Sequence, residues 1–363
     1  MPTWWKQLRA TVPGPFLAAL ALGAGFLAFV AWDQSHWWRV KQDYSFGWLV
    51  PLFVIFVVYD RWPRITAALS ACAAADSSRA TGWQKWVLRL LLGAALAFGV
   101  LMFLLGSFYR AGAGTSQPGT LAITMGAAAI LLPLLFVNAP EPGSGGPVGI
   151  GPAADAVRLT PVPNSGASPV GQRPAVQVTG AGLFDDARVR LAALFLFPAL
   201  VWLVSAPMVS AVETQLNLTL LRKVVTVVAF VFETLGLPIE QQGNVLALPK
   251  GNVGVEDACS GIRSLTGCLF AGSFLAAVFL EKLWKKVALV GAAMLLAFVT
   301  NLGRSLFLTT WAYRYGPDAI DGVVHDIAGY AVLGFTVVGL LCLLPLLNLK
   351  FDSRMPESES GAH

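Results

Sequence analysis

The chain has 363 residues, of which 56% are hydrophobic and only 12% are charged. A soluble domain carries about twice that charged fraction and less apolar content, so the composition excludes an ordinary soluble protein. Several apolar runs reach the roughly 20 residues that cross a bilayer. The sequence therefore predicts an all-α polytopic membrane protein.

The formal net charge is +5. In a membrane protein, excess Lys and Arg first indicate topology, and no basic patch interleaved with aromatic residues points to nucleic acid. The four cysteines show neither CxxC spacing nor histidine pairing, so no metal site, cofactor or disulfide framework is predicted. Three of them lie in Ala- and Leu-rich sequence and are expected to be packing residues: Cys72, Cys268 and Cys342.

Eight membrane spans are predicted in chain order, over residues 14–32, 46–59, 86–108, 119–137, 190–211, 260–280, 287–310 and 323–347. No small-residue cleavage site follows the first apolar run, so it is predicted to be a retained span. The distribution of Lys and Arg between the spans places both termini in the cytoplasm, and residues 281–286 form the clearest inside loop.

Residues 138–189 interrupt this single membrane domain. They are rich in Pro, Gly and Ser and have almost no apolar periodicity, so a flexible cytoplasmic insertion is predicted. The insertion contains the tripeptide Pro140-Glu141-Pro142. Because it lies in a Pro-rich loop that is predicted to be cytoplasmic, we interpret it as a result of composition and not as a functional motif.

Residues 212–258 are predicted to be the main extracytoplasmic segment. Residues 213–235 have helical apolar spacing and are predicted to form an amphipathic helix along the membrane surface. The alternative, a ninth crossing, is weakened by four charged residues: Glu213, Arg222, Lys223 and Glu233. Two short extended runs then flank a turn at residues 249–251, which predicts a β-hairpin leading to Cys259 at the bilayer edge.

Three chemically useful residues fall at one predicted depth. Cys259 begins the sixth span from the outside, Arg304 lies late in the seventh, and His325 opens the eighth. An arginine near a membrane core is costly unless it has a partner or a function. Each residue alone has a simpler interpretation, namely a packing cysteine, a snorkelling arginine and a surface histidine. Their common depth favours a joint site.

The residue types indicate thiol acyl-transfer chemistry. Cys259 near a helix amino terminus and close to a cation would have a lowered thiol pKa. Asp257 is a candidate cap for that helix. Arg304 could stabilise a thiolate or an oxyanion, and His325 could carry protons.

Three neighbouring residues are candidates for supporting roles. Asn301 lies one helical turn before Arg304 and could orient it or donate to a substrate carbonyl. Arg263 is an alternative anion binder. Asp326 could orient His325, but adjacent helical side chains point about 100° apart, so it is the weaker partner.

These segments resemble the exosortase/archaeosortase family of polytopic transpeptidase-like proteins. The matching elements are DACSGIRSL at 257–265, NLGR at 301–304, HDIAG at 325–329, GLP at 236–238 with GN at 243–244, and YSFGWLVP at 44–51. In the last of these the family usually has His where this chain has Phe46, which leaves the role of the first outer loop open. The resemblance covers about residues 44–60 and 190–340.

The resemblance implies a bacterial inner-membrane cysteine protease/transpeptidase that sorts secreted proteins, with its active site outside. Its substrates would end in a short Pro-Glu-Pro-type motif, a transmembrane helix and a basic tail. By similarity Cys259 would form a thioester with the substrate, and a surface acceptor would then take the acyl group. Two alternatives remain: a transporter that uses Arg304 and His325 for ion or proton passage, and a polysaccharide-export scaffold with a vestigial site.

Overall fold

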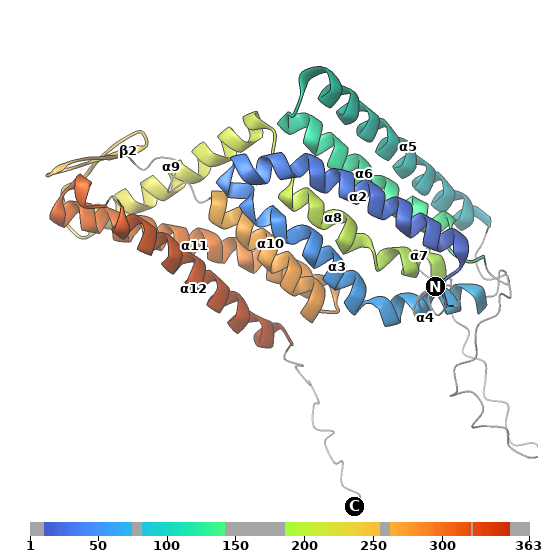
Figure 1. Ribbon diagram of the computed structural model, residues 1–363. Helices are drawn as coiled ribbons and strands as arrows, with labels where there is room; N and C mark the ends of the chain where they lie inside the picture. Colours follow the sequence, from blue (N-terminus) through green and yellow to red (C-terminus); the bar gives the residue numbers. More distant parts are fainter. Residues whose placement is uncertain (1–10, 75–81, 142–185, 255–261, 321, 349–363) are drawn as a thin grey trace, which may run out of the picture. The chain divides into compact units, whose positions relative to one another are not determined.

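The structure is a computed structural model, and it describes residues 11–74, 82–141, 186–254, 262–320 and 322–348 (Figure 1). Eight of the described helices are long and apolar enough to cross a membrane, which confirms the all-α polytopic class. They are Gly14–Val40, Gln42–Asp60, Trp83–Ala113, Gln117–Val137, Ala187–Ser205, Ser210–Thr234, Leu283–Tyr315 and Val323–Leu347. The chain groups into two compact units, residues 1–36 with 51–206, and residues 37–50 with 207–363. We call them unit 1 and unit 2.

Unit 1 is built from helices. It contains most of α2 (Gly14–Val40), followed by α3 (Val50–Asp60), α4 (Trp62–Ala74), α5 (Gly82–Ala113), α6 (Gln117–Val137), α7 (Ala187–Ala193) and α8 (Leu196–Ser205). Helices α5 and α6 pack backbone to backbone through glycines. A Cβ added at Gly126 would lie 2.5 Å from the Phe103 nitrogen, and one at Gly106 would lie 2.7 Å from the Gly119 oxygen. Small residues allow such close approach between membrane helices.

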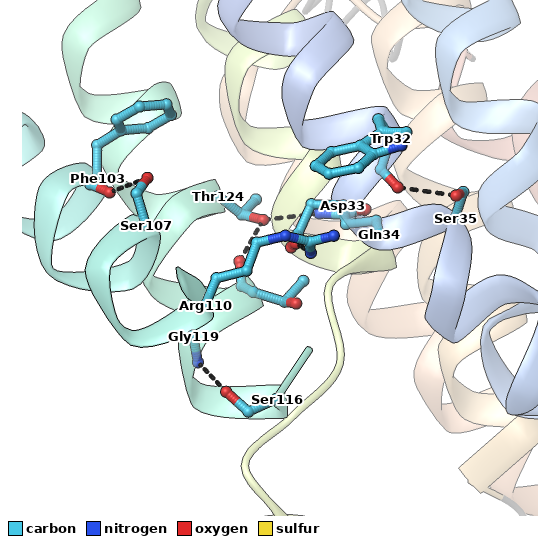
Figure 2. A network of polar contacts seen from close by, with 11 residues as sticks. Trp32, Asp33, Gln34, Ser35, Phe103, Ser107, Arg110, Ser116, Gly119 and Thr124 are labelled. Carbon is cyan, nitrogen blue, oxygen red and sulfur yellow. Dashed lines mark hydrogen bonds and ion pairs between the residues drawn. The ribbon is translucent and has the colours of Figure 1, made fainter. Parts of the chain in front are cut away.

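The first helix runs further than predicted, to Val40 rather than residue 32. Asp33 and Gln34, which directly follow the predicted end of this span, are 1% and 0% exposed. Asp33 forms an ion pair with Arg110 of α5, whose guanidinium lies over the Trp32 ring at 4.2 Å (Figure 2). A charge buried among helices is tolerated when it is paired, so the helix continues through it.

Gln34 joins three helices of unit 1. Its Nε2 donates to Thr124 Oγ1 at 2.8 Å and to the Trp202 carbonyl at 3.1 Å, and its Oε1 accepts from Ser205 Oγ at 2.8 Å. Figure 2 shows Gln34 and Thr124 within the larger polar network that also contains Arg110. Helices α2, α6 and α8 are therefore linked by side-chain hydrogen bonds within the core.

Two predicted spans are divided differently in the structure. The span predicted over 46–59 is a 3-10 helix, η1 (Gln42–Leu49), followed by α3. The span predicted over 190–211 consists of α7 and α8 and ends at Ser205. Ala206 is extended, with φ −74° and ψ 140°, because a residue before proline is disfavoured in helical conformation.

Unit 2 contains η1, α9 (Ser210–Thr234), a small sheet, α10 (Ile262–Phe279), α11 (Leu283–Tyr315), η5 (Pro317–Ile320) and α12 (Val323–Asn348). The sheet is antiparallel in the order β1 (Glu240–Gln242), β2 (Val245–Leu248) and β3 (Gly251–Gly254). Its β2–β3 pair, with Leu248 opposite Gly251, confirms the predicted hairpin. Strand β1 was not predicted, because its Glu-Gln-Gln sequence is exposed and lacks an apolar alternation.

The sheet lies against the carboxyl-terminal end of α11. Leu248 and Val253 pack with Ala312, and the Lys250 amino group donates to the Arg314 carbonyl. In Figure 1, α9 and α11 converge beside the β2 label. The sheet and the loop after α11 therefore share one end of unit 2.

Helices α10, α11 and α12 form an antiparallel group with its own core (Figure 1). Glycines set the close contacts. A Cβ at Gly272 of α10 would lie 2.7 Å from Ala293 Cβ, and one at Gly339 of α12 would lie 2.5 Å from Leu296 Cδ2. These contacts fix the relative heights of the three helices, and Arg304 and His325 lie toward one end of this group.

Helix α9 differs from the predicted surface segment in its length. Its 25 residues would extend about 37 Å, and it is among the helices that could span a membrane. Its buried residues Val224 and Val228 belong to a core that includes Leu302 and Leu306 of α11. Helix α10, which corresponds to the predicted sixth span, has 18 residues and is not among the eight. The surface position of α9 stays a prediction.

Candidate functional site

An arginine–histidine pair joins α11 to α12. Arg304 Nη2 lies 2.7 Å from His325 Nε2, and both side chains are half-buried. A guanidinium can only donate hydrogen bonds, so Nε2 is the acceptor. The imidazole in this arrangement is therefore neutral and carries its proton on Nδ1. The structure thus brings together two of the three residues predicted to do chemistry.

Two residues of the sequence motifs, Gly329 and Asn301, lie close to the pair along the helices. A Cβ at Gly329, one turn after His325, would lie 3.8 Å from Arg304 Nη2, so the guanidinium extends along this small residue. Asn301 is 2% exposed and its carbonyl accepts from Ser305 Oγ at 3.1 Å. Asp326 is exposed, and its role in orienting His325 stays a prediction.

The position of Arg304 along α11 agrees with the predicted depth. Nineteen residues separate it from Lys285, a rise of about 28 Å, close to the thickness of a bilayer core. If Lys285 lies at one membrane surface, Arg304 approaches the other. This distance fits a site near an interface better than one at the membrane midplane.

The start of α10 lies at the same height as the pair. Gly272 contacts Ala293 in the antiparallel α10–α11 hairpin. Ten residues back along α10 is Ile262, and ten residues forward along α11 is Gly303. Because both helices rise equally per residue, Ile262 is level with the residue before Arg304.

Three of the predicted site residues cannot be placed by the structure. Cys259 and Asp257 lie outside the described residues, and so does the side chain of Arg263. Cys259 precedes Ile262 by three residues, and a chain of that length reaches at most about 11 Å. The nucleophile assignment therefore stays a prediction, with the height of Ile262 as its nearest structural support.

The other three cysteines are free thiols. Cys72 is 0% exposed, and burial raises the pKa of its thiol to about 11, as expected of an inert packing residue. Cys268 is 4% exposed and hydrogen bonds the Thr336 side chain. Cys342 is exposed on α12, so the expectation that it packs within the chain is wrong.

Contacts of η1 were missed at the sequence level. Phe46, at the position where the resemblance leads one to expect His, stacks on Phe270 of α10 with ring centroids 5.1 Å apart. Thr266 Oγ1 lies 3.1 Å from the Asp43 carbonyl. Local sequence patterns cannot predict contacts between residues that are more than 200 positions apart in the chain, such as Asp43 and Thr266. Within the described residues, no group of three or more His, Cys, Asp or Glu could hold a metal ion.

The fold and this pair define a polytopic membrane protein with an Arg–His site at one end of a helical group. The model of the transmembrane exosortase family matches residues 178–342, a stretch that contains α7 to α11 and most of α12. The match confirms the resemblance noted from the motifs within residues 178–342, and the motif at 44–51 lies outside it. Neither a curated protein nor a solved structure gives a significant match.

Proposed function

We propose that the protein is an exosortase-type cysteine protease/transpeptidase of the bacterial inner membrane. It would cleave the carboxyl-terminal sorting signals of secreted proteins on the extracytoplasmic side and transfer them to an acceptor. The observation that carries this proposal is the 2.7 Å contact between Arg304 and His325, inside the matched region and level with the start of α10.

In the first half-reaction, the thiol of Cys259 attacks the scissile carbonyl. As negative charge develops on the carbonyl oxygen, Arg304 donates to it and releases His325 Nε2. The freed nitrogen accepts the thiol proton while the carbon–sulfur bond forms. The carbon–nitrogen bond then breaks, the imidazolium protonates the departing amine, and a thioester remains on Cys259.

In the second half-reaction, an acceptor nucleophile attacks the thioester. It gives its proton to the neutral imidazole, the carbon–sulfur bond breaks, and the departing thiolate is reprotonated by His325. With water as acceptor the outcome is hydrolysis, and with an amine or hydroxyl it is transfer. Arg304 stabilises the oxyanion in both halves.

The Arg–His contact also gives the resting enzyme a defined state. With Nε2 held by Arg304, His325 is not free to remove a proton from the thiol. A substrate carbonyl that recruits Arg304 would release the base at the moment it is needed. This coupling would keep the Cys259 thiol from reacting before a sorting signal is bound.

The test is a cleavage assay with purified protein in lipid. The substrate is a peptide with a Pro-Glu-Pro-type motif, a transmembrane helix and a basic tail. Wild-type protein should release the anchor, Cys259→Ala should not, and Cys268→Ala should behave like wild type, because Cys268 is a buried packing residue. A transporter or a scaffold would cleave nothing, and a transporter would instead change flux when Arg304 is replaced.

A further inference from the structure

The segment between α2 and α3 belongs to unit 2. Residues 37–50 group with residues 207–363, although they precede the family-matched region by more than 100 residues of chain. Within this segment, η1 packs against α10. The unit that carries the Arg–His pair thus includes a short element from the amino-terminal part of the chain.

Two contacts attach η1 to the first half of α10. Thr266 is 5% exposed, and its hydroxyl lies 3.1 Å from the Asp43 carbonyl and 3.0 Å from the Ile262 carbonyl, so one proton is shared between two acceptors. One turn further along, Phe270 stacks on Phe46 with an interplanar angle of 28°. Successive turns of α10 are therefore held from the same side.

The segment is also attached to residues at and just before the start of α9. Tyr44 is 1% exposed, and its hydroxyl accepts from the Met208 nitrogen at 3.0 Å. Lys41 pairs with Glu213 at 2.6 Å. A Cβ at Gly47 would lie 2.1 Å from the Trp38 Nε1, so this position has no room for a side chain.

We propose that η1 positions α10 for the reaction and that Thr266 is the positioning residue at their junction. This inference rests on the proposed function, since α10 follows the nucleophile Cys259. Thr266 lies one turn after Ile262, where the helix is level with Gly303 and the Arg–His pair. A displacement of about 1 Å in a reacting group can cost 10²-fold in rate. Loss of the Thr266 contact near the helix start is therefore expected to affect turnover more than substrate binding.

The experiment compares three variants of the full-length protein in lipid. Thr266→Val removes the hydroxyl and keeps the shape, and Thr266→Ser restores the hydroxyl. Thr310→Val is the matched control, because Thr310 is exposed and its hydroxyl donates to the Leu306 carbonyl of its own helix. Each is assayed for kcat and KM on the sorting-signal peptide, normalised to folded protein, and for hydrogen exchange in residues 42–49 and 262–270.

Thr266→Val should lower kcat about tenfold with KM within about twofold, Thr266→Ser should recover most of that loss, and Thr310→Val should match wild type. Exchange should rise in both segments for Thr266→Val. A kcat equal to wild type overturns the inference, as does an equal loss in Thr266→Ser or Thr310→Val, or unchanged exchange. Failure of the wild-type protein to cleave contradicts the proposed function, whereas the exchange result still decides whether Thr266 holds η1 on α10.

Discussion

Arg304 contacts His325 through a guanidinium group, which has hydrogen-bond donors and no acceptor. The contact at 2.7 Å makes Nε2 the acceptor and the imidazole neutral. Lysine carries a compact ammonium with different reach and geometry. It therefore cannot reproduce the contacts of the guanidinium, first with the imidazole and then with an oxyanion. The identity of this residue is therefore expected to matter more than its charge.

Arg304→Lys should lower kcat/KM for the sorting-signal peptide by about 10²-fold or more, because the forked donor is lost. Arg314→Lys is the control, since Arg314 is exposed on the same helix. Full activity of Arg304→Lys would remove the guanidinium from the mechanism. The same assay reads both variants.

His325→Ala should lower the rate by about 10²- to 10⁴-fold, the range for loss of a proton carrier. Asp326→Asn should have little effect, because its side chain is exposed beside His325. Comparable losses in the two variants would mean that Asp326 orients the imidazole after all.

Cys72 should resist alkylation in the folded protein. It is 0% exposed, and its thiol pKa is raised to about 11 by burial, so little thiolate exists at neutral pH. As pH rises toward 11 the thiolate fraction should grow, and denaturant should make labelling fast at any alkaline pH. Rapid labelling of Cys72 in the native state at neutral pH would contradict its packing role.

At the scale of elements, buried polar contacts decide where helices continue and where they end. Helix α2 continues past Asp33 because Arg110 pairs with that carboxylate and because Gln34 has partners on α6 and α8. From the sequence alone the span is predicted to end just before these two residues. Their partners are far away along the chain, and only the packed structure identifies them.

Arg110→Ala should destabilise the protein by about 3–5 kcal/mol, because it leaves the Asp33 carboxylate buried without its partner. The double variant Asp33→Ala with Arg110→Ala should be more stable than Arg110→Ala alone. Arg89→Ala, at an exposed position of the same helix, is the control. Thermal unfolding in detergent measures all three, and equal stability of Arg110→Ala and Arg89→Ala would contradict the role of the ion pair.

The helical elements and the Arg–His pair follow from the sequence to different extents. Hydropathy predicts the apolar helices and charge predicts which loops lie inside, since both signals are local. The proximity of Arg304 and His325 was predicted because the membrane topology places both residues at the same depth. That prediction needed no knowledge of side-chain contacts. The contact between Thr266 and Asp43 could not be predicted, because no periodicity links segments 223 residues apart.

For the whole molecule, the direction of each helix can be tested with introduced cysteines. Lys250 and Tyr315 belong to the same end of unit 2, since the Lys250 side chain reaches the Arg314 carbonyl. Reagents applied from outside should label cysteines at both positions and miss one at Lys285, near the start of α11. Labelling of Lys285→Cys from outside would invert the predicted topology.

The same method decides whether α9 crosses the membrane. Val212 lies in the first turn of α9, Leu235 directly follows the helix, and both are exposed. If α9 lies on the outer surface, Val212→Cys and Leu235→Cys should both be labelled from outside, and if it crosses, only one of them will be. Two labelled ends would keep the eight predicted spans, with α10 rather than α9 as the sixth.

The central claim is that Cys259 forms a thioester with the substrate at a site served by Arg304 and His325. The most direct measurement is mass spectrometry of the protein after brief exposure to the sorting-signal peptide without an acceptor. A hydroxylamine-sensitive adduct of the peptide's amino-terminal fragment should appear on Cys259 and be absent in Cys259→Ala. Cleavage without an adduct and undiminished in Cys259→Ala would contradict the thiol mechanism.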